Sequence, residues 1–125
     1  MSPETRSYAV HASSTTTFGR VLVSARDQHL VVDGPVQNGC PGEAVTPAEL
    51  FLGGVAACAV ELVQVLARDQ QVNLTAVAAT INGVMDPANR VREDVNVFNA
   101  VTLEFELAGV GDEDAAMLVE AFKGR

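Results

Sequence analysis

The longest apolar stretch of the chain lies within residues Thr46–Asp69 and carries the signals of a helix N-terminus. Thr46 is a suitable cap residue, and Pro47 suits the first helical position. Glu49 follows the cap by three residues, which completes the pattern of a capping box. The sequence therefore predicts one long helix over residues 46–69.

The interior of this predicted helix, residues 50–67, is apolar on nearly every side. Its ionisable groups are Glu61 and the thiol of Cys58. A helix with so little polar surface must be buried. The pattern places a single reactive sulfur near the middle of a buried helix, which makes Cys58 the first candidate for chemistry.

Alternation of apolar and polar residues predicts short strands on both sides of the helix. The expected strands are Ser7–Ala12, Phe18–Ala25, Gln28–Asp33, Val72–Val84 and Phe98–Leu107, and a second, acid-rich helix is expected over Asp112–Phe122. This order of strands, helix, strands and helix predicts an α+β fold with antiparallel sheet around a long buried central helix. A length of 125 residues is that of a single domain, residues 1–125, with a modest core.

The apolar helix needs cover on more than one side, and so few strands can hardly supply it. Gly53 and Gly54 lie inside this helix, where the pair costs about 2 kcal/mol relative to alanine. That cost suggests the close approach of another backbone. We therefore expect a homodimer in which a partner subunit covers the helix.

Charge excludes several classes of function. The chain has 16 acidic and 8 basic residues, a formal net charge of -8, and Lys123 as its one lysine. Without clustered cations, neither a nucleic-acid partner nor an anionic membrane surface is expected. The longest apolar run, Leu50–Val60, is too short to span a bilayer, and the N-terminus does not resemble a secretory signal. We expect a cytoplasmic protein.

The cysteines and histidines argue against a metal centre. His11 and His29 lie far apart in the sequence, and no CxxC motif or His/Cys cluster is present. Two cysteines without an export signal are typical of reduced or redox-active thiols. We expect neither a metal nor an organic cofactor.

The elements T-P-A-E-L-F and A-A-C-A-V-E in one apolar helix resemble the OsmC/Ohr family of bacterial hydroperoxide-handling proteins. The F-N-A-V-T-L-E-F-E-L strand and the D-E-D-A-A-M-L-V-E-A-F-K helix fit the same pattern. The resemblance extends from about residue 18 to residue 125. It implies an OsmC-like fold, an intertwined homodimer with two long central helices packed between sheets, and a reactive cysteine on each helix.

In this family the reactive cysteine attacks organic hydroperoxides, and a second cysteine, in a C-P dipeptide after the last helix, resolves the sulfenic acid. The resemblance assigns Cys58 as the peroxidatic cysteine and Arg20 as the arginine that completes the site. The family's glutamate position is Ala48 here, and Glu49 is the nearest acid. No second cysteine follows the last predicted helix in residues 123–125, so either this is a truncated form or this branch of the family lacks a resolving cysteine there. Without that cysteine, we expect an external thiol to act as the reductant.

Several alternatives remain open at this stage. From the residues alone, a buried structural role for Cys58 is the commoner one, and Glu61 beside the sulfur would oppose thiolate formation. Cys40, in a C-P-G loop, is either a resolving thiol or an exposed loop cysteine with no functional role. Apolar residues Phe51 and Val55 near the Cys58 face are either a pocket for an alkyl hydroperoxide or core packing.

The favoured interpretation is a thiol-dependent peroxidase of organic hydroperoxides with Cys58, Arg20 and Glu49 at its site. The principal alternative is a non-catalytic dimer of the same fold that binds a small apolar ligand. Acyl transfer through Cys58 is a weaker third hypothesis because it requires a histidine base, and no motif ties either histidine to the thiol.

Overall fold

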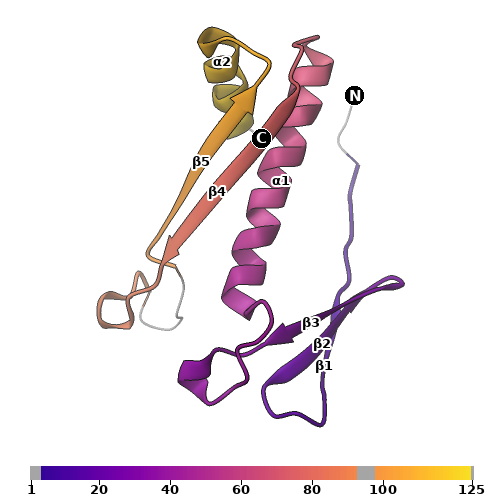
Figure 1. Cartoon of the computed structure of the whole chain (residues 1–125), viewed down its shortest axis with the longest axis vertical. Helices are drawn as coiled ribbons and strands as arrows, with labels where there is room; N and C mark the ends of the chain where they lie inside the picture. The colour runs from indigo at the N-terminus through magenta and orange to yellow at the C-terminus, as the bar shows by residue number, and fades with distance from the viewer. Residues whose placement is uncertain (1–3, 93–97, 125) are drawn as a thin grey trace. The chain divides into compact units, whose positions relative to one another are not determined.

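The computed structural model describes residues 4–92 and 98–124. Its backbone contacts divide the chain into two compact units, Met1–Leu50 and Phe51–Arg125. The elements of both units are labelled in Figure 1. The composition is two antiparallel sheets, two α-helices and two short 3-10 segments, which confirms the α+β prediction for the described residues.

The first unit contains a three-stranded antiparallel sheet in the order β1-β2-β3. The strands are β1 (His11–Ser14), β2 (Arg20–Ala25) and β3 (Gln28–Asp33). Strands β2 and β3 form the predicted hairpin, with Ala25 opposite Gln28 at the turn and Arg20 opposite Asp33 at the other end.

The first strand was predicted too early, over residues 7–12. Residues 7–10 are not in a strand, and β1 instead includes Ser13 and Ser14, which pair with Leu22 and Val21 of β2. All four residues of β1 are exposed. An edge strand with no buried face does not need alternating polarity, so its sequence gives no pattern to detect.

The link from β3 to the long helix contains a 3-10 segment, Val36–Asn38, and ends at the predicted capping box. The Glu49 carboxylate accepts hydrogen bonds from the backbone N–H and the hydroxyl of Thr46, both at 2.9 Å. Helix α1 (Pro47–Asp69) begins directly after this cap. Its predicted start and end are therefore confirmed to within one residue.

The second unit contains a two-stranded antiparallel sheet, β4 (Ala76–Val84) with β5 (Ala100–Ala108), and helix α2 (Asp112–Lys123). A short 3-10 segment, Pro87–Asn89, follows β4. Strand β4 begins four residues later than predicted, and Val72 and Leu74, which precede it, pack against the core. The buried core joins the C-terminal half of α1 to α2 and consists of Val63, Leu66, Ala67 and Leu118.

Helix α1 is only partly buried within the single chain. Its buried residues are Ala59, Val63, Leu66 and Ala67, and 22% of its most apolar 18-residue window is buried. By length and composition alone, α1 is the one helix of the described residues that could cross a bilayer. The long helix is confirmed, and its buried residues all lie in its C-terminal half.

Candidate functional site

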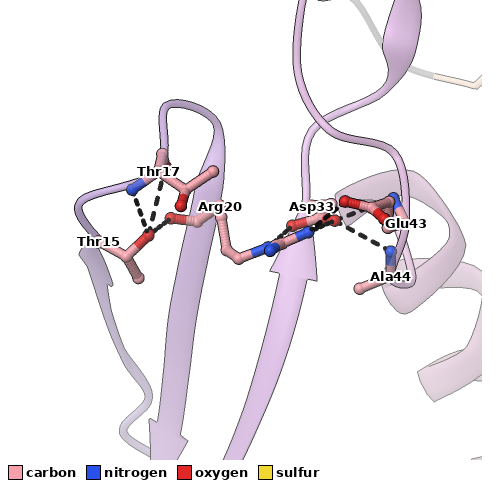
Figure 2. A network of polar contacts seen from close by, with 6 residues as sticks. All are labelled: Thr15, Thr17, Arg20, Asp33, Glu43 and Ala44. Carbon is pink, nitrogen blue, oxygen red and sulfur yellow. Dashed lines mark hydrogen bonds and ion pairs between the residues drawn. The ribbon is translucent and has the colours of Figure 1, made fainter.

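The best-defined polar arrangement in the chain is built around Arg20 at the start of β2. Its guanidinium makes a two-point contact with the Asp33 carboxylate at the end of β3, with Nε to Oδ1 at 2.8 Å and Nη2 to Oδ2 at 2.9 Å. The same Nη2 also donates to Glu43 Oε1 at 3.1 Å. Figure 2 shows the three side chains pointing toward one another. Paired arginine–carboxylate contacts of this kind fix orientation as well as charge.

Asp33 is fully buried and accepts two further hydrogen bonds, from the backbone N–H groups of Glu43 at 2.9 Å and Ala44 at 3.0 Å. The hydrogen bond from Arg20 is the main cause that lowers the pKa of Asp33 to about 2, against the opposing effect of burial. Asp33 in turn raises the pKa of Arg20, with a smaller contribution from Glu43. The carboxylate of Asp33 therefore ties both the arginine and the residue 43–44 loop to the sheet.

The backbone on the other side of Arg20 is also fixed. The Thr15 hydroxyl donates to the Arg20 carbonyl at 2.9 Å, and the Arg20 N–H donates to the Thr17 carbonyl at 3.1 Å (Figure 2). These bonds close the turn that joins β1 to β2. Arg20 thus has a defined direction, although its side chain is 31% exposed.

Cys40 packs beside this network rather than standing free in the loop. A Cβ added at Gly19 or at Gly34 would lie 2.5 Å from the Cys40 sulfur. These two glycines precede Arg20 and follow Asp33, so the absence of their side chains makes room for the thiol. Cys40 is half-buried and is not disulfide-bonded.

Cys58 lies on α1 with its side chain exposed and its thiol free. Val55 and Phe51 precede Cys58 by three and seven residues, about one and two helical turns, and lie on the same strip of the helix; they are 37% and 60% exposed. Glu61 is also exposed. Within this single chain the side chain of Cys58 lies beside an apolar surface strip of α1.

The predicted site residues fall into different parts of the chain. Arg20 and Glu49 belong to the first unit and Cys58 to the second. The Glu49 carboxylate accepts a hydrogen bond from the backbone N–H of Thr46. This hydrogen bond is the main cause that lowers the pKa of Glu49. The carboxylates that hold Arg20 are Asp33 and Glu43, which the sequence interpretation did not name.

No group of three or more His, Cys, Asp or Glu side chains gathers in the described part of the chain. His29 contacts Ser24 across the β2–β3 pair, with Nδ1 and Oγ 2.7 Å apart, on an exposed surface.

Comparison with known proteins identifies the class of protein. The model of the family described as OsmC-like protein matches residues 40–124, more than half of the chain. The chain therefore belongs to the OsmC-like family. The structures it resembles include proteins of the OsmC/Ohr group, which confirms the family and the fold expected from the sequence.

Three solved structures illustrate the likeness. An OsmC-like protein from Mycoplasma pneumoniae has a TM-score of 0.81 at 13% identity, with 96% of this chain and 82% of that one covered. An organic hydroperoxide resistance protein, OsmC, from Legionella pneumophila has a TM-score of 0.71 at 24% identity, with coverage of 96% and 84%. The organic hydroperoxide resistance protein OhrB of Bacillus subtilis has a TM-score of 0.61 at 21% identity, with coverage of 94% and 83%. No curated protein sequence matches the chain.

Proposed function

We propose that this OsmC-like protein is a cytoplasmic thiol-dependent peroxidase that reduces organic hydroperoxides as part of an oxidative stress response. The observation that supports this most directly is the free thiol of Cys58 beside apolar side chains on α1. Relatives of the same fold from Legionella pneumophila and Bacillus subtilis are named organic hydroperoxide resistance proteins.

The proposed reaction starts with the Cys58 thiolate, because the thiol is a poor nucleophile. The sulfur attacks the terminal oxygen of the hydroperoxide, a new S–O bond forms, and the O–O bond breaks. Cys58 is oxidised to a sulfenic acid, while the peroxide is reduced to an alkoxide that takes up a proton to give the alcohol. An external thiol then condenses with the sulfenic acid, releasing water and forming a mixed disulfide. A second external thiol then attacks the mixed disulfide, which forms a disulfide between the two external thiols and releases the Cys58 thiolate.

Arg20 is the proposed cation that stabilises the thiolate and orients the peroxide. Two of its donor nitrogens are engaged by Asp33 and Glu43, and its Nη1 makes no hydrogen bond to any described residue. Asp33 would therefore set the direction in which Nη1 points. Glu49 has a supporting role in this proposal, because it fixes the start of the helix that carries Cys58.

Cys40 is assigned a packing role rather than that of a resolving thiol. Its sulfur fills the space left by Gly19 and Gly34. If the Cys40 side chain moved out of this space to form a disulfide, it would leave a gap beside Arg20 and Asp33. An external thiol is accordingly the proposed reductant.

The proposed working unit is a homodimer in which a second copy completes the single OsmC-like domain. The apolar surface of α1 supports this. The most apolar 18-residue stretch of the helix has a mean hydropathy of 2.0, yet only 22% of it is buried in the single chain. The two helical glycines, Gly53 and Gly54, have nothing within 4 Å of a built Cβ in the described chain. Both features suit a close helix contact with a partner subunit.

The proposal is tested by turnover. The protein is mixed with cumene hydroperoxide and excess dithiothreitol, and cumyl alcohol is measured over many equivalents per protein chain. Catalytic formation of the alcohol that is lost in Cys58→Ser, and retained in Cys40→Ser, is the expected result. Formation no faster than dithiothreitol alone would reject the peroxidase.

A non-catalytic dimer that binds a small apolar ligand is the second candidate. The observation in its favour is that Arg20 already has two carboxylate partners, which compensate its charge. This candidate predicts that Cys58 reacts with hydroperoxides no faster than a free thiol, while an apolar fluorescent probe still binds to the α1 surface and is displaced by apolar competitors.

A further inference from the structure

The two histidines of the chain lie in one row of the N-terminal sheet. His11 of β1 is paired with Ser24 of β2, and Ser24 is in turn paired with His29 of β3. Directly opposed residues of neighbouring strands carry their side chains on the same face of a sheet. The antiparallel register therefore places on one face two imidazoles that are far apart in the sequence.

The spacing of this row suits two ligands of one metal ion. Opposed Cα atoms of antiparallel strands are about 4.5–5.5 Å apart, which puts the Cα atoms of His11 and His29 about 10 Å apart. An imidazole nitrogen binds a transition metal at about 2.0–2.1 Å, so two nitrogens on one ion lie within about 4 Å of each other. Two histidine side chains that lean toward each other over the short side chain of Ser24 close this difference.

Ser24 already supports the ring of His29. Its Oγ lies 2.7 Å from His29 Nδ1, a hydrogen-bonding distance. Metal-binding histidines usually donate their other ring N–H to a neighbouring oxygen, which fixes the tautomer and the orientation of the ring. With Ser24 as this acceptor, His29 Nδ1 carries the proton and Nε2 keeps its lone pair for an ion. The sheet thus supplies a ligand together with the group that orients it.

The row is open to ions from solvent. His11 and His29 are exposed, while Ser24 between them is half-buried. The formal net charge of -8 favours the approach of a cation. Imidazole ligands suit zinc, nickel and copper, and the affinity of such ligands for first-row divalent ions is highest for Cu²⁺.

We propose that His11 and His29 form a binding site for a divalent transition-metal ion, with Cu²⁺ bound most tightly. Ser24 is a positioning residue that acts through the His29 ring. Water completes the coordination, because no group of three or more His, Cys, Asp or Glu side chains gathers in residues 4–92 and 98–124. The bound ion links the exposed edge strand β1 to β3 across β2. This site requires neither Cys58 nor the proposed peroxidase activity.

The test is isothermal titration calorimetry of the full chain with copper(II) chloride. A Cys40→Ser, Cys58→Ser background removes the two thiols, which would otherwise bind and reduce Cu²⁺. His11→Ala and His29→Ala each remove one proposed ligand. The variant that combines both changes measures how much Cu²⁺ binds to the N-terminal amine and the surface carboxylates.

Two serine variants separate the positioning role from general effects on the sheet. Ser24→Ala removes the hydrogen-bond partner of His29 and keeps both imidazoles. Ser13→Ala is the matched control, since Ser13 lies on the same strand as His11 and is paired with Leu22. Far-UV circular dichroism and urea unfolding without metal establish that each variant is folded.

The expected result is one Cu²⁺ per chain above the level of the double histidine variant. Each single histidine variant should lower the affinity at least tenfold, and Ser24→Ala about tenfold, the lower end of the effect of losing such a supporting group. Ser13→Ala should match the background protein. Hydrogen exchange of the β1 amides should slow on addition of Cu²⁺ in the background protein and not in His11→Ala.

Equal Cu²⁺ affinity in the background protein and the double histidine variant would overturn the proposed site. An affinity that falls in one single histidine variant and not in the other would also overturn it, because the ion would then be held by one imidazole. An unchanged affinity in folded Ser24→Ala would overturn the positioning role of Ser24.

Discussion

Replacing Gly53 and Gly54 of α1 with alanine should change the stability of the protein in opposite directions, depending on whether this helix surface is free or covered by a partner subunit. Gly53 and Gly54 lie in the interior of Pro47–Asp69, and a Cβ built on either meets nothing within 4 Å in the described chain. On a free surface, each Gly→Ala change should stabilise the helix by about 1 kcal/mol. The double variant would then be more stable by about 2 kcal/mol, or roughly 30-fold in the folding equilibrium.

The proposed homodimer predicts the reverse. If a second copy packs closely against Gly53 and Gly54, two added methyl groups separate the helices, and overpacking of this kind costs about 1–3 kcal/mol. The double variant should therefore dissociate at protein concentrations where the parent is a dimer, and its unfolding midpoint should fall. Gln64→Ala, at an exposed position further along α1, is the control and should leave the dimer intact.

The assay combines sedimentation velocity with urea unfolding at two protein concentrations about tenfold apart. For an obligate dimer the parent midpoint rises with concentration. A double variant that gains about 2 kcal/mol, with no change in mass or in concentration dependence, would refute the close helix contact.

Three further predictions concern the fold around the site. Leu118→Ala should lower the free energy of unfolding by about 2–5 kcal/mol, because Leu118 is fully buried, whereas Met117→Ala at a 40% exposed position should cost far less; chemical denaturation measures both. The pKa of Asp33 is lowered from 3.8 to about 2, so its ionised form stabilises the fold above the unfolded-state pKa and this contribution is lost as pH falls through the folded-state pKa. The stability difference between the parent and Asp33→Asn, followed by urea unfolding, should therefore be constant above about pH 5 and shrink between about pH 4 and pH 2. Thr46→Ala should cost about 1 kcal/mol as a lost helix cap, and an unchanged midpoint would contradict the capping role.

The long helix could be predicted from the sequence because several independent signals agree on it. Thr46, Pro47 and Glu49 mark its start, and the structure shows the corresponding cap hydrogen bonds. The hairpin of β2 and β3 was predictable for a similar reason, since a turn at residues 26–27 separates two apolar segments. The edge strand β1 was not, because its exposed residues carry no alternating pattern.

The partners of Arg20 could have been found from the hairpin register. A turn at residues 26–27 pairs residue 25 with residue 28, and counting back along both strands pairs Arg20 with Asp33. Glu43 could not have been found in this way, because its place depends on how the loop folds over the sheet. The same holds for Cys40, whose packing depends on space at two glycines distant in sequence.

The roles of Cys58, Arg20 and Glu49 as one site remain predictions. Phe98 illustrates why the sequence was insufficient for the contacts of α1. It lies far along the chain from Phe51, and the pairing of β4 with β5 brings the two rings into their stacked contact.

The proposed site of Cys58 and Arg20 can be tested by the rate at which cumene hydroperoxide oxidises Cys58 at neutral pH in the Cys40→Ser protein, compared with the same protein carrying Arg20→Ala. We expect oxidation far faster than that of a free thiol in the Cys40→Ser protein and a loss of most of that acceleration without Arg20. Oxidation at the free-thiol rate in both proteins would reject the peroxidase and leave a binding protein of the OsmC-like fold.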